Sequence, residues 1–395
     1  MVLRFLTAGE SHGPGLSIIL DGVPSGLALD PAAVDDQLRR RQAGHGRGAR
    51  MHIETDRAQW TAGLRHGMTL GSPIALSIPN LDYRNWEQIM SPFGAAPEPP
   101  LRRVTAPRPG HADLAGGTQR RSADLRDVLE RASARETAAR VAVGAVARQF
   151  LQVFGVRILG HTRAVGDVSM DLAVPEDVSY DDLEARAAAN DLAVLDAATY
   201  TRMVAAIDLA KRAGDTLGGV VEVCVTGLPP GLGSYTHWDR KLDGRLGQAV
   251  LSIPAVKGVE IGPAFANAAL RGSEVHDPIQ RTSQGAVRRS RNRAGGLEGG
   301  VTNGEALVVR AAMKPLSTLM KPLPSIDVRS GEPARAAVER SDTCAVPACG
   351  VVAEAMVAFV LAQVWLEKFA GDCMEDVVAS WRGYVREVER WIPSS

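Results

Sequence analysis

The sequence contains few cysteines, few lysines and no long uninterrupted hydrophobic run. Only four of its 395 residues are cysteines, and none of them has the CxxC spacing of a zinc site. No basic and then apolar leader precedes the first motif, so the sequence predicts a protein of the reducing cytoplasm. The most apolar stretch, residues 349–369, is interrupted by Glu354, Gln363 and Glu367. These interruptions favour a buried helix over a membrane span.

Only six of the 45 basic residues are lysines, so guanidinium groups carry almost all of the positive charge. Guanidinium suits bidentate binding of carboxylate and phosphate. A GC-rich genome would produce the same bias, so we count only clustered arginines as functional signals. The 45 acidic residues balance the basic ones, and no basic stripe is interleaved with aromatic residues. Both features argue against a nucleic-acid-binding protein.

The length and ordinary hydrophobicity suffice for a substantial core, in one large domain or in two closely joined halves. Asp30 and Pro31 have the pattern of a helix N-cap and first turn, which predicts a helix that ends near Gly44. Apolar runs bounded by Gly, Pro or Asn predict strands at residues 16–20, 73–78, 219–225 and 306–310. The irregular alternation of strands and helices favours a mixed α/β or α+β architecture over a regular doubly wound sheet.

Two histidines lie in similar settings among small residues. His12 lies in the segment Gly9-Glu10-Ser11-His12-Gly13, and His111 lies in Arg108-Pro109-Gly110-His111-Ala112-Asp113. Paired imidazoles are suited to proton transfer. A third charged element, Arg340-Ser341-Asp342, follows far later in the chain. The sequence therefore predicts an enzyme whose site is assembled by folding.

A first arginine cluster surrounds the glycine-rich loop of residues 44–50. The preceding helix holds Arg39, Arg40 and Arg41 in its last turn, where compensation of the helix dipole is an equally good explanation. Arg47 and Arg50 lie beyond the helix, where the dipole needs no compensation. A loop of this kind can close over an anion.

A second cluster places Arg131 and Arg135 around a predicted helix start. Ser133 and Glu136 have capping-box spacing ahead of an Ala- and Val-rich run that reaches about Leu151. Because a helix N-terminus is already electropositive, arginines there are explained by a bound phosphate or carboxylate. The alternative is pairing of the arginines with nearby acidic residues, which are Asp124, Asp127 and Glu130.

Two further segments carry weaker signals. The glycine-rich run of residues 295–300 lacks both the ending of a P-loop and the spacing of a Rossmann turn, and a strand follows it. Residues 314–318, Lys-Pro-Leu-Ser-Thr, provide a cation and two hydroxyl groups at a strand exit. That setting is suitable for a polar cofactor.

In their joint order these motifs resemble those of the chorismate synthase family over nearly the whole chain. Three separated signatures carry the resemblance: residues 9–13, residues 130–137, and residues 340–342 followed by Ala353-Glu354-Ala355-Met356. Supporting matches lie at residues 108–113, 214–219, 256–262 and 295–300. The resemblance implies a single α+β catalytic domain over residues 1–395, in which helices are sandwiched between antiparallel sheets.

The resemblance also implies the chemistry, that of a carbon–oxygen lyase of the shikimate pathway and aromatic amino-acid biosynthesis. Such a lyase converts 5-enolpyruvylshikimate 3-phosphate to chorismate by 1,4-anti elimination of phosphate and a C6 proton, and it requires reduced FMN that is not consumed. A cytoplasmic homotetramer is implied, with no metal, nucleic acid or membrane. The family includes members that reduce FMN with NADPH and members that need a separate flavin reductase. Because no nicotinamide-binding motif is visible, we expect the latter.

Individual roles follow from the same resemblance. His12 would be the acid near the leaving phosphate, with Ser11 orienting its imidazole. His111 would protonate reduced flavin at N1, and Asp342 would act with flavin N5 in removing the C6 proton. Substrate contacts would come from five arginines, namely Arg41, Arg47, Arg108, Arg135 and Arg340. Flavin contacts would come from Arg131, Ala132, Ser133, Ala255, Gly299, Lys314, Pro315, Leu316, Ser317, Thr318 and Arg340.

The chain departs from the family pattern at three places. Leu114 and Arg120-Arg121 stand where Tyr and Lys-Tyr are frequent, and Pro254 stands where Asn or Gln is usual. The proline removes a side-chain amide and a backbone donor, which bears on flavin binding more than on the reaction type. The alternative function from another class is a non-catalytic anion- or nucleotide-binding protein that uses the same arginines.

Overall fold

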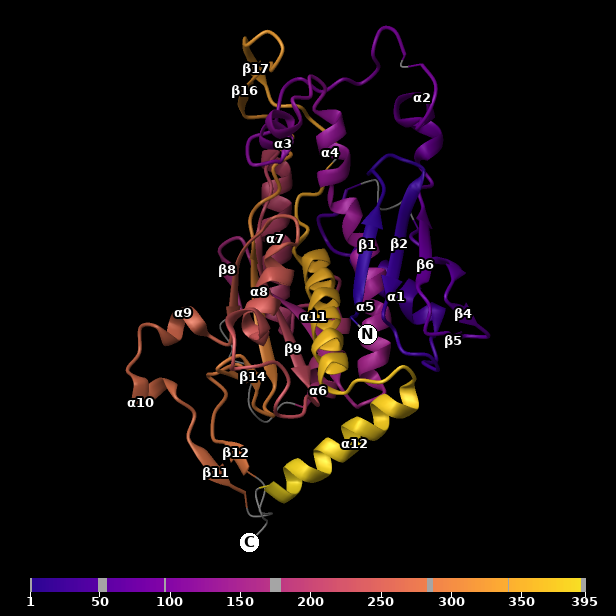
Figure 1. The fold of residues 1–395 in the computed structure, drawn as a ribbon. Helices are drawn as coiled ribbons and strands as arrows, with labels where there is room; N and C mark the ends of the chain where they lie inside the picture. The colour runs from indigo at the N-terminus through magenta and orange to yellow at the C-terminus, as the bar shows by residue number, and fades with distance from the viewer. Residues whose placement is uncertain are drawn as a thin grey trace.

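The structure, a computed structural model, describes residues 2–48, 55–95, 97–170, 179–282, 287–339 and 341–391. Two antiparallel sheets lie on either side of a pair of long central helices (Figure 1). This is the α+β arrangement of helices between antiparallel sheets that the family resemblance implies.

The first sheet has the strand order β1-β2-β6-β3. Its strands are β1 (Arg4–Ala8), β2 (Gly15–Asp21), β6 (Ile74–Pro79) and β3 (Gln59–Ala62). In β2, Leu16, Ile18 and Leu20 are almost fully buried, whereas Ser17 and Ile19 are exposed on the other face. This alternation is the strand period of two. The strands predicted at residues 16–20 and 73–78 are confirmed.

The second sheet has the order β10-β15-β9-β7-β8. Its strands are β10 (Val256–Ile261), β15 (Leu307–Met313), β9 (Gly219–Thr226), β7 (Arg157–Val165) and β8 (Val168–Ser169). Val221, Val223 and Val225 of β9 are buried on the face that looks towards the central helices. The strands predicted at residues 219–225 and 306–310 are confirmed as β9 and β15.

The central helices are α5 (Thr137–Gln152) and α11 (Val346–Lys368), and α1 (Pro31–Gln42) packs against both. The two cross at Gly144 of α5, where an added Cβ would lie 2.3 Å from Ala355 of α11. By length and composition α11 could cross a membrane, but 94% of its most apolar window is buried inside the protein. The buried helix predicted for this stretch is confirmed.

The helices α1 and α5 begin differently. Asp30 caps α1 as predicted, because its carboxylate accepts a hydrogen bond from the Ala32 N–H at 2.9 Å. The capping box predicted at Ser133 is wrong. Ser133 instead opens a 3-10 turn, η3 (Ala134–Glu136), so that α5 starts only at Thr137. The Glu136 carboxylate does not return to the Ser133 backbone because its two oxygens accept hydrogen bonds from the Thr7 hydroxyl and from Arg140 of α5, both at 2.9 Å.

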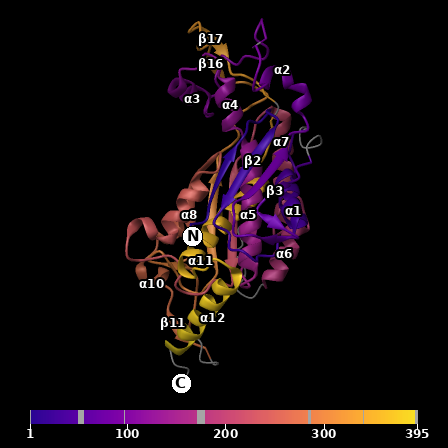
Figure 2. The same cartoon turned by 45° about the vertical axis from the view of Figure 1, so that its right-hand side comes forward.

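The remaining elements surround this layered body (Figures 1 and 2). One end carries a cap, which we define as residues 83–132 and 324–335. The cap contains η2 (Tyr83–Asn85), α2 (Glu87–Met90), α3 (Asp113–Arg120), α4 (Arg126–Ala132), β16 (Pro324–Ile326) and β17 (Pro333–Arg335). The opposite end carries α9 (Ala264–Asn267), α10 (Gly272–Val275), β11 (Ile279–Arg281), β12 (Val287–Arg289) and α12 (Met374–Trp391).

Further short elements complete the layers. The helices α6 (Tyr180–Ala188) and α7 (Ala197–Ala213) cover the β7–β8 edge of the second sheet, and α8 (Leu242–Leu251) packs against α11 and β10. The others are β4 (Leu64–Arg65), β5 (Met68–Thr69), β13 (Leu297–Glu298), β14 (Val301–Thr302) and η4 (Trp238–Arg240).

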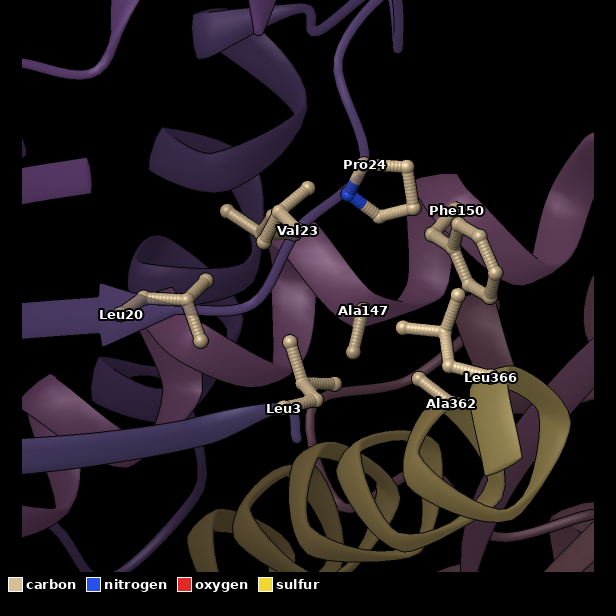
Figure 3. A pocket seen from close by; sticks show the side chains of 9 residues that line it. Leu3, Leu20, Val23, Pro24, Ala147, Phe150, Ala362 and Leu366 are labelled. Atoms are coloured by element: carbon tan, nitrogen blue, oxygen red, sulfur yellow. The ribbon is translucent and has the colours of Figure 1, made fainter. Parts of the chain in front are cut away.

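A small cavity of about 10 Å³ lies where the N-terminus, β2, α5 and α11 meet. Figure 3 shows its walls, among them Leu3 and Leu20 on one side and Ala147, Phe150 and Leu366 on the other. Its lining is entirely apolar, so it offers no partner to a water molecule or a polar ligand. It is a packing gap of the core and not a functional site.

Candidate active site

A cavity of about 300 Å³ opens between the cap and the N-terminal ends of α5 and α11. It brings together residues from segments that are far apart in the sequence, including both predicted histidines and the late aspartate. The predicted site residues that line it are Ser11, His12, Arg41, Arg47, Arg108, His111, Ser133, Arg135, Ala255, Leu316, Ser317, Thr318 and Asp342.

Other predicted residues do not line this cavity. These are Arg131, Ala132, Gly299, Lys314 and Pro315. The Arg131 guanidinium donates hydrogen bonds to the carbonyl oxygens of Thr7 and Gly9 instead. Lys314 does approach the histidine loop, since an added Cβ at Gly110 would lie 3.7 Å from its Nζ. Arg340, and residues 49 and 50 of the glycine-rich loop, lie outside the described residues.

His12 is held by the carboxylate of Glu130, a contact that the sequence did not indicate. Its ring Nδ1 lies 2.9 Å from Oε1 of Glu130, and its backbone N–H donates to Oε2 of Glu130 at 2.8 Å. Glu130 also accepts a hydrogen bond from Arg126 at 3.0 Å. Burial alone would raise the pKa of Glu130, but the hydrogen bonds from His12 and Arg126 hold that pKa below its ordinary value. Glu130 is therefore a charged anchor for the imidazole.

The imidazole of His12 also stacks on Trp86, with ring centroids 3.7 Å apart and an interplanar angle of 27°. Trp86 is buried, and its Nε1 donates to Asp82 at 3.2 Å. Together the indole and Glu130 fix the plane of the His12 ring and the direction of its Nδ1.

His111 has an analogous anchor. Its Nδ1 lies 2.6 Å from Oδ1 of Asp113, and the Arg108 guanidinium donates to the same carboxylate at 2.8 and 3.1 Å. Burial works to raise the pKa of Asp113, but hydrogen bonds from His111 and Arg108 hold it well below its usual range. Arg108 also donates to the Thr318 hydroxyl at 2.8 Å, which ties the histidine loop to residues 314–318.

Two buried arginines share one carboxylate. Arg41 donates to Oδ2 of Asp56 at 2.7 Å, and Arg135 donates to Oδ1 of the same residue. Burial works to raise the pKa of Asp56, but the two guanidiniums hold it below its ordinary value. Because two cations face a single anion, this part of the cavity keeps a net positive charge. That charge is suited to a phosphate or carboxylate ligand.

Asp342 is held by the glycine-rich loop that the sequence singled out. Its Oδ2 lies 2.7 Å from the Arg47 guanidinium, and its Oδ1 accepts a hydrogen bond from the Gly48 N–H at 2.6 Å. A Cβ added to Gly48 would lie 3.0 Å from the Ser341 carbonyl oxygen. The close approach of the loop therefore depends on a small residue there. The loop and the late aspartate segment form one wall of the cavity.

The hydroxyl groups of Ser11 and Ser133 lie 3.0 Å apart, and both residues line the cavity. Ser133 also accepts a hydrogen bond from the Arg135 N–H. The segment that carries His12 is thereby connected to the start of the second arginine cluster.

One wall of the cavity is apolar and comes from the second sheet, its loops and the first turns of α11. It consists of Ile253, Pro254, Met313, Ala345, Ala348, Cys349 and Val352. Burial raises the pKa of the Cys349 thiol to about 12, so this cysteine is part of the apolar wall and not a nucleophile. The cavity can thus take a ligand that has both a flat apolar part and anionic groups. Two helix N-termini, those of α5 and α11, add partial positive charge.

The sequence did not single out the carboxylate of Asp56, the indole of Trp86, or Arg102, which also lines the cavity. It named Glu130 only as a possible partner of the arginines and as part of the signature at residues 130–137. Only Asp113 had a local signal, because it lies two residues after His111 in the same motif. Among the residues that the structure describes, no three His, Cys, Asp or Glu side chains are grouped to hold a metal ion.

Known proteins match the chain over nearly its full length. The family model described as chorismate synthase matches residues 3–366. A chorismate synthase of Symbiobacterium thermophilum is 54% identical over 392 residues, which cover 98% of this chain and 100% of the relative. One of Thermus thermophilus is 55% identical over 377 residues, which cover 95% and 96%. A crystal structure of a chorismate synthase matches with a TM-score of 0.78 and 40% identity, and covers 99% of both chains.

Proposed function

The chain belongs to the chorismate synthase family of carbon–oxygen lyases, and we propose that the cavity described above is its active site. The substrate would be 5-enolpyruvylshikimate 3-phosphate, which loses phosphate and a C6 proton by 1,4-anti elimination to give chorismate. The observation that carries the proposal is the convergence of two carboxylate-held histidines, Asp342 and the cavity arginines on one cavity.

The substrate carries a phosphate and two carboxylates, so it requires several cations in a site shielded from water. Arg41 and Arg135 provide a net positive charge around Asp56, and Arg47 and Arg108 line the same cavity. Guanidiniums arranged in advance stabilise the charge that develops on a departing phosphate. We propose these four arginines as substrate-binding residues, together with Arg340.

His12 is proposed to donate a proton to the leaving phosphate. Because Nδ1 faces Glu130, the proton would pass through Nε2 on the other side of the ring. The buried carboxylate of Glu130 orients the ring for this transfer. Ser11 and Ser133, with hydroxyls 3.0 Å apart, would help to position the His12 segment.

Asp342 is the carboxylate proposed to take part in removing the C6 proton. Its two oxygens accept hydrogen bonds from Arg47 and the Gly48 N–H, and each oxygen keeps a further lone pair for a proton. The loop that holds Asp342 therefore aims the carboxylate without blocking it. Removal of the C6 proton with the help of Asp342 would accompany proton donation from His12 to the leaving phosphate.

The apolar wall and the hydroxyl groups of residues 314–318 fit a flavin. Ala255, Leu316, Ser317 and Thr318 line the cavity next to Arg108, whose carboxylate partner also anchors His111. We propose that these residues hold reduced FMN, with His111 keeping a proton next to N1. When bound, the cofactor would supply electron density transiently as the carbon–oxygen bond breaks. Pro254 lines the same wall. Because proline has no side-chain amide, it would contact the flavin only by packing.

The contacts proposed for Arg131, Ala132, Gly299, Lys314 and Pro315 rest on the family resemblance alone. The same holds for a cytoplasmic homotetramer and for a separate flavin reductase. We further propose that residues 1–395 act as one catalytic unit, because one hydrophobic core runs from Leu3 to Val377. A non-catalytic anion-binding protein is not favoured, since the relatives at more than half identity are named as enzymes.

An anaerobic assay tests the proposal. Purified protein with chemically reduced FMN and 5-enolpyruvylshikimate 3-phosphate should release phosphate and chorismate in equal amounts, with no net oxidation of FMN. Tight substrate binding without phosphate release would instead support the anion-binding alternative. A parallel assay with oxidised FMN and NADPH separates the two sources of reduced flavin, and we expect no turnover until a flavin reductase is added.

A further inference from the structure

Arg102 lines the cavity but differs from its other arginines in charge balance. The four that were predicted each form an ion pair with an aspartate. Among the residues described by the structure, Arg102 pairs with no carboxylate, and its guanidinium contacts the indole of Trp86. The charge of Arg102 is thus available to a ligand.

Trp86 connects this guanidinium to the proposed acid. The Cζ atom of Arg102 lies 4.3 Å from the Trp86 ring centroid, and the His12 ring lies 3.7 Å from it. The indole is 6% exposed and is fixed through Nε1 to Asp82. A guanidinium over an indole gains a cation–π attraction and loses rotamer freedom before any ligand binds. Arg102 and His12 therefore contact the same indole.

The backbone of Arg102 is also held in an uncommon conformation. Its φ angle is +51°, which non-glycine residues rarely adopt. The Arg102 carbonyl oxygen accepts a hydrogen bond from Nε of the buried Arg126 at 2.7 Å, and the same guanidinium donates to Glu130 at 3.0 Å. One buried arginine therefore fixes both the anchor of His12 and the loop of Arg102. Backbone strain that is maintained in this way is common at functional sites.

The charges explain what such a pair can bind. The His12 ring already has the Glu130 carboxylate as its partner, whereas the Arg102 guanidinium contacts only the indole among the described residues. The charge of Arg102 is therefore suited to an anionic group of a ligand in the cavity. We propose that Arg102 is a further substrate-binding residue, which contacts the phosphate group that leaves beside His12. This inference rests on the proposed function and adds a residue to it.

Steady-state kinetics with a matched control test the inference. Arg102→Met should lower kcat/KM for 5-enolpyruvylshikimate 3-phosphate by about 10- to 100-fold, mainly through KM, because a charge-assisted contact to substrate is lost. Arg102→Lys keeps the charge without the planar fork and should lose less. The control is Arg103→Met. Arg103 is the next residue, lies 3.9 Å from Asp124 and does not line the cavity, so its variant should match wild type.

A second readout needs no turnover. Inorganic phosphate should raise the Tm of the ligand-free wild type and of Arg103→Met, because a ligand of the folded state stabilises it. The rise should be at least halved in Arg102→Met. Sodium chloride at equal ionic strength corrects for screening. Trp86→Phe, which keeps an aromatic face, should retain more of the phosphate effect than Trp86→Leu.

The outcomes separate the inference from the function. If wild type eliminates phosphate and Arg102→Met matches it in both kcat/KM and phosphate stabilisation, Arg102 is not a binding residue although the function stands. If wild type does not turn over, the proposed function fails, and the phosphate stabilisation alone decides whether Arg102 binds phosphate. Should Arg102→Met not unfold cooperatively, the comparison of Arg102→Lys with wild type replaces it.

Discussion

Glu130 accepts hydrogen bonds from both the ring and the backbone of His12, at 2.9 and 2.8 Å. The two bonds join residues 118 positions apart in the chain. Because the ring and the main chain are held by the same carboxylate, neither can shift without the other. The position of this imidazole is therefore set by α4 and not by the loop that carries it.

Glu130→Gln should lower kcat by about 10- to 100-fold while KM changes less than about threefold, since the amide keeps the shape but weakens the charge-assisted hydrogen bond that orients the imidazole. Steady-state rates with reduced FMN measure this. Asp127→Asn, on the same helix but exposed, is the control and should match wild type. A wild-type kcat in Glu130→Gln would show that Glu130 does not anchor His12 for catalysis.

Asp56→Asn should reduce the free energy of unfolding by about 3 kcal/mol, because two buried guanidiniums lose their shared counter-charge. Urea unfolding at neutral pH measures the loss. Phosphate should stabilise this variant more than it stabilises wild type, since an added anion replaces the missing carboxylate. Equal stabilisation of the two proteins would show that phosphate binds elsewhere.

The pH dependence of stability should include a contribution from Glu222 on β9. Burial works to raise its pKa, but His161 and Arg310 lower it from 4.5 to about 2. A lowered carboxyl pKa contributes stability that is complete above the unfolded value near 4.5 and is lost as the pH falls towards about 2. Glu222→Gln should therefore be less stable than wild type by about 2 kcal/mol at neutral pH. The difference should shrink below pH 4.5 in urea titrations, and a constant difference down to pH 3 would contradict the assignment.

Gly144→Ala should destabilise the protein by more than about 2 kcal/mol, because the new Cβ would lie 2.3 Å from Ala355 and push α5 away from α11. Gly247→Ala is a control for which the opposite change in stability is expected. Gly247 lies in α8 with nothing within 4 Å of an added Cβ, so alanine should stabilise that helix by about 0.5–1 kcal/mol. Thermal unfolding of both variants would show whether the crossing of the central helices tolerates a methyl group.

The sequence was sufficient where a structure depends on local signals. The alternation in residues 16–20 and the Asp30-Pro31 start of α1 depend only on neighbouring residues, and both were predicted correctly. The start of α5 was misplaced because Glu136 binds Arg140 and the distant Thr7 instead of completing a capping box, and spacing alone does not reveal these partners.

The partners of the site residues required the folded chain. The carboxylate of Glu130 belongs to a recognised motif, but its contact with His12 depends on how the cap lies over the first sheet. Asp56 and Trp86 lie in segments with no motif, and only the fold brings them to the arginines and the imidazole. Residues whose partners are distant in the sequence form no motif of characteristic spacing, so the sequence alone does not reveal them.

The shared carboxylate of Asp56 has a consequence for the kinetics of association. Because folding already orders Arg41 and Arg135 around it, an incoming polyanion meets a preorganised receptor and loses little affinity to ordering side chains. The association rate would then be limited by diffusion of the polyanion into the cavity. This rate would fall steeply as added salt screens the electrostatic field of the arginines.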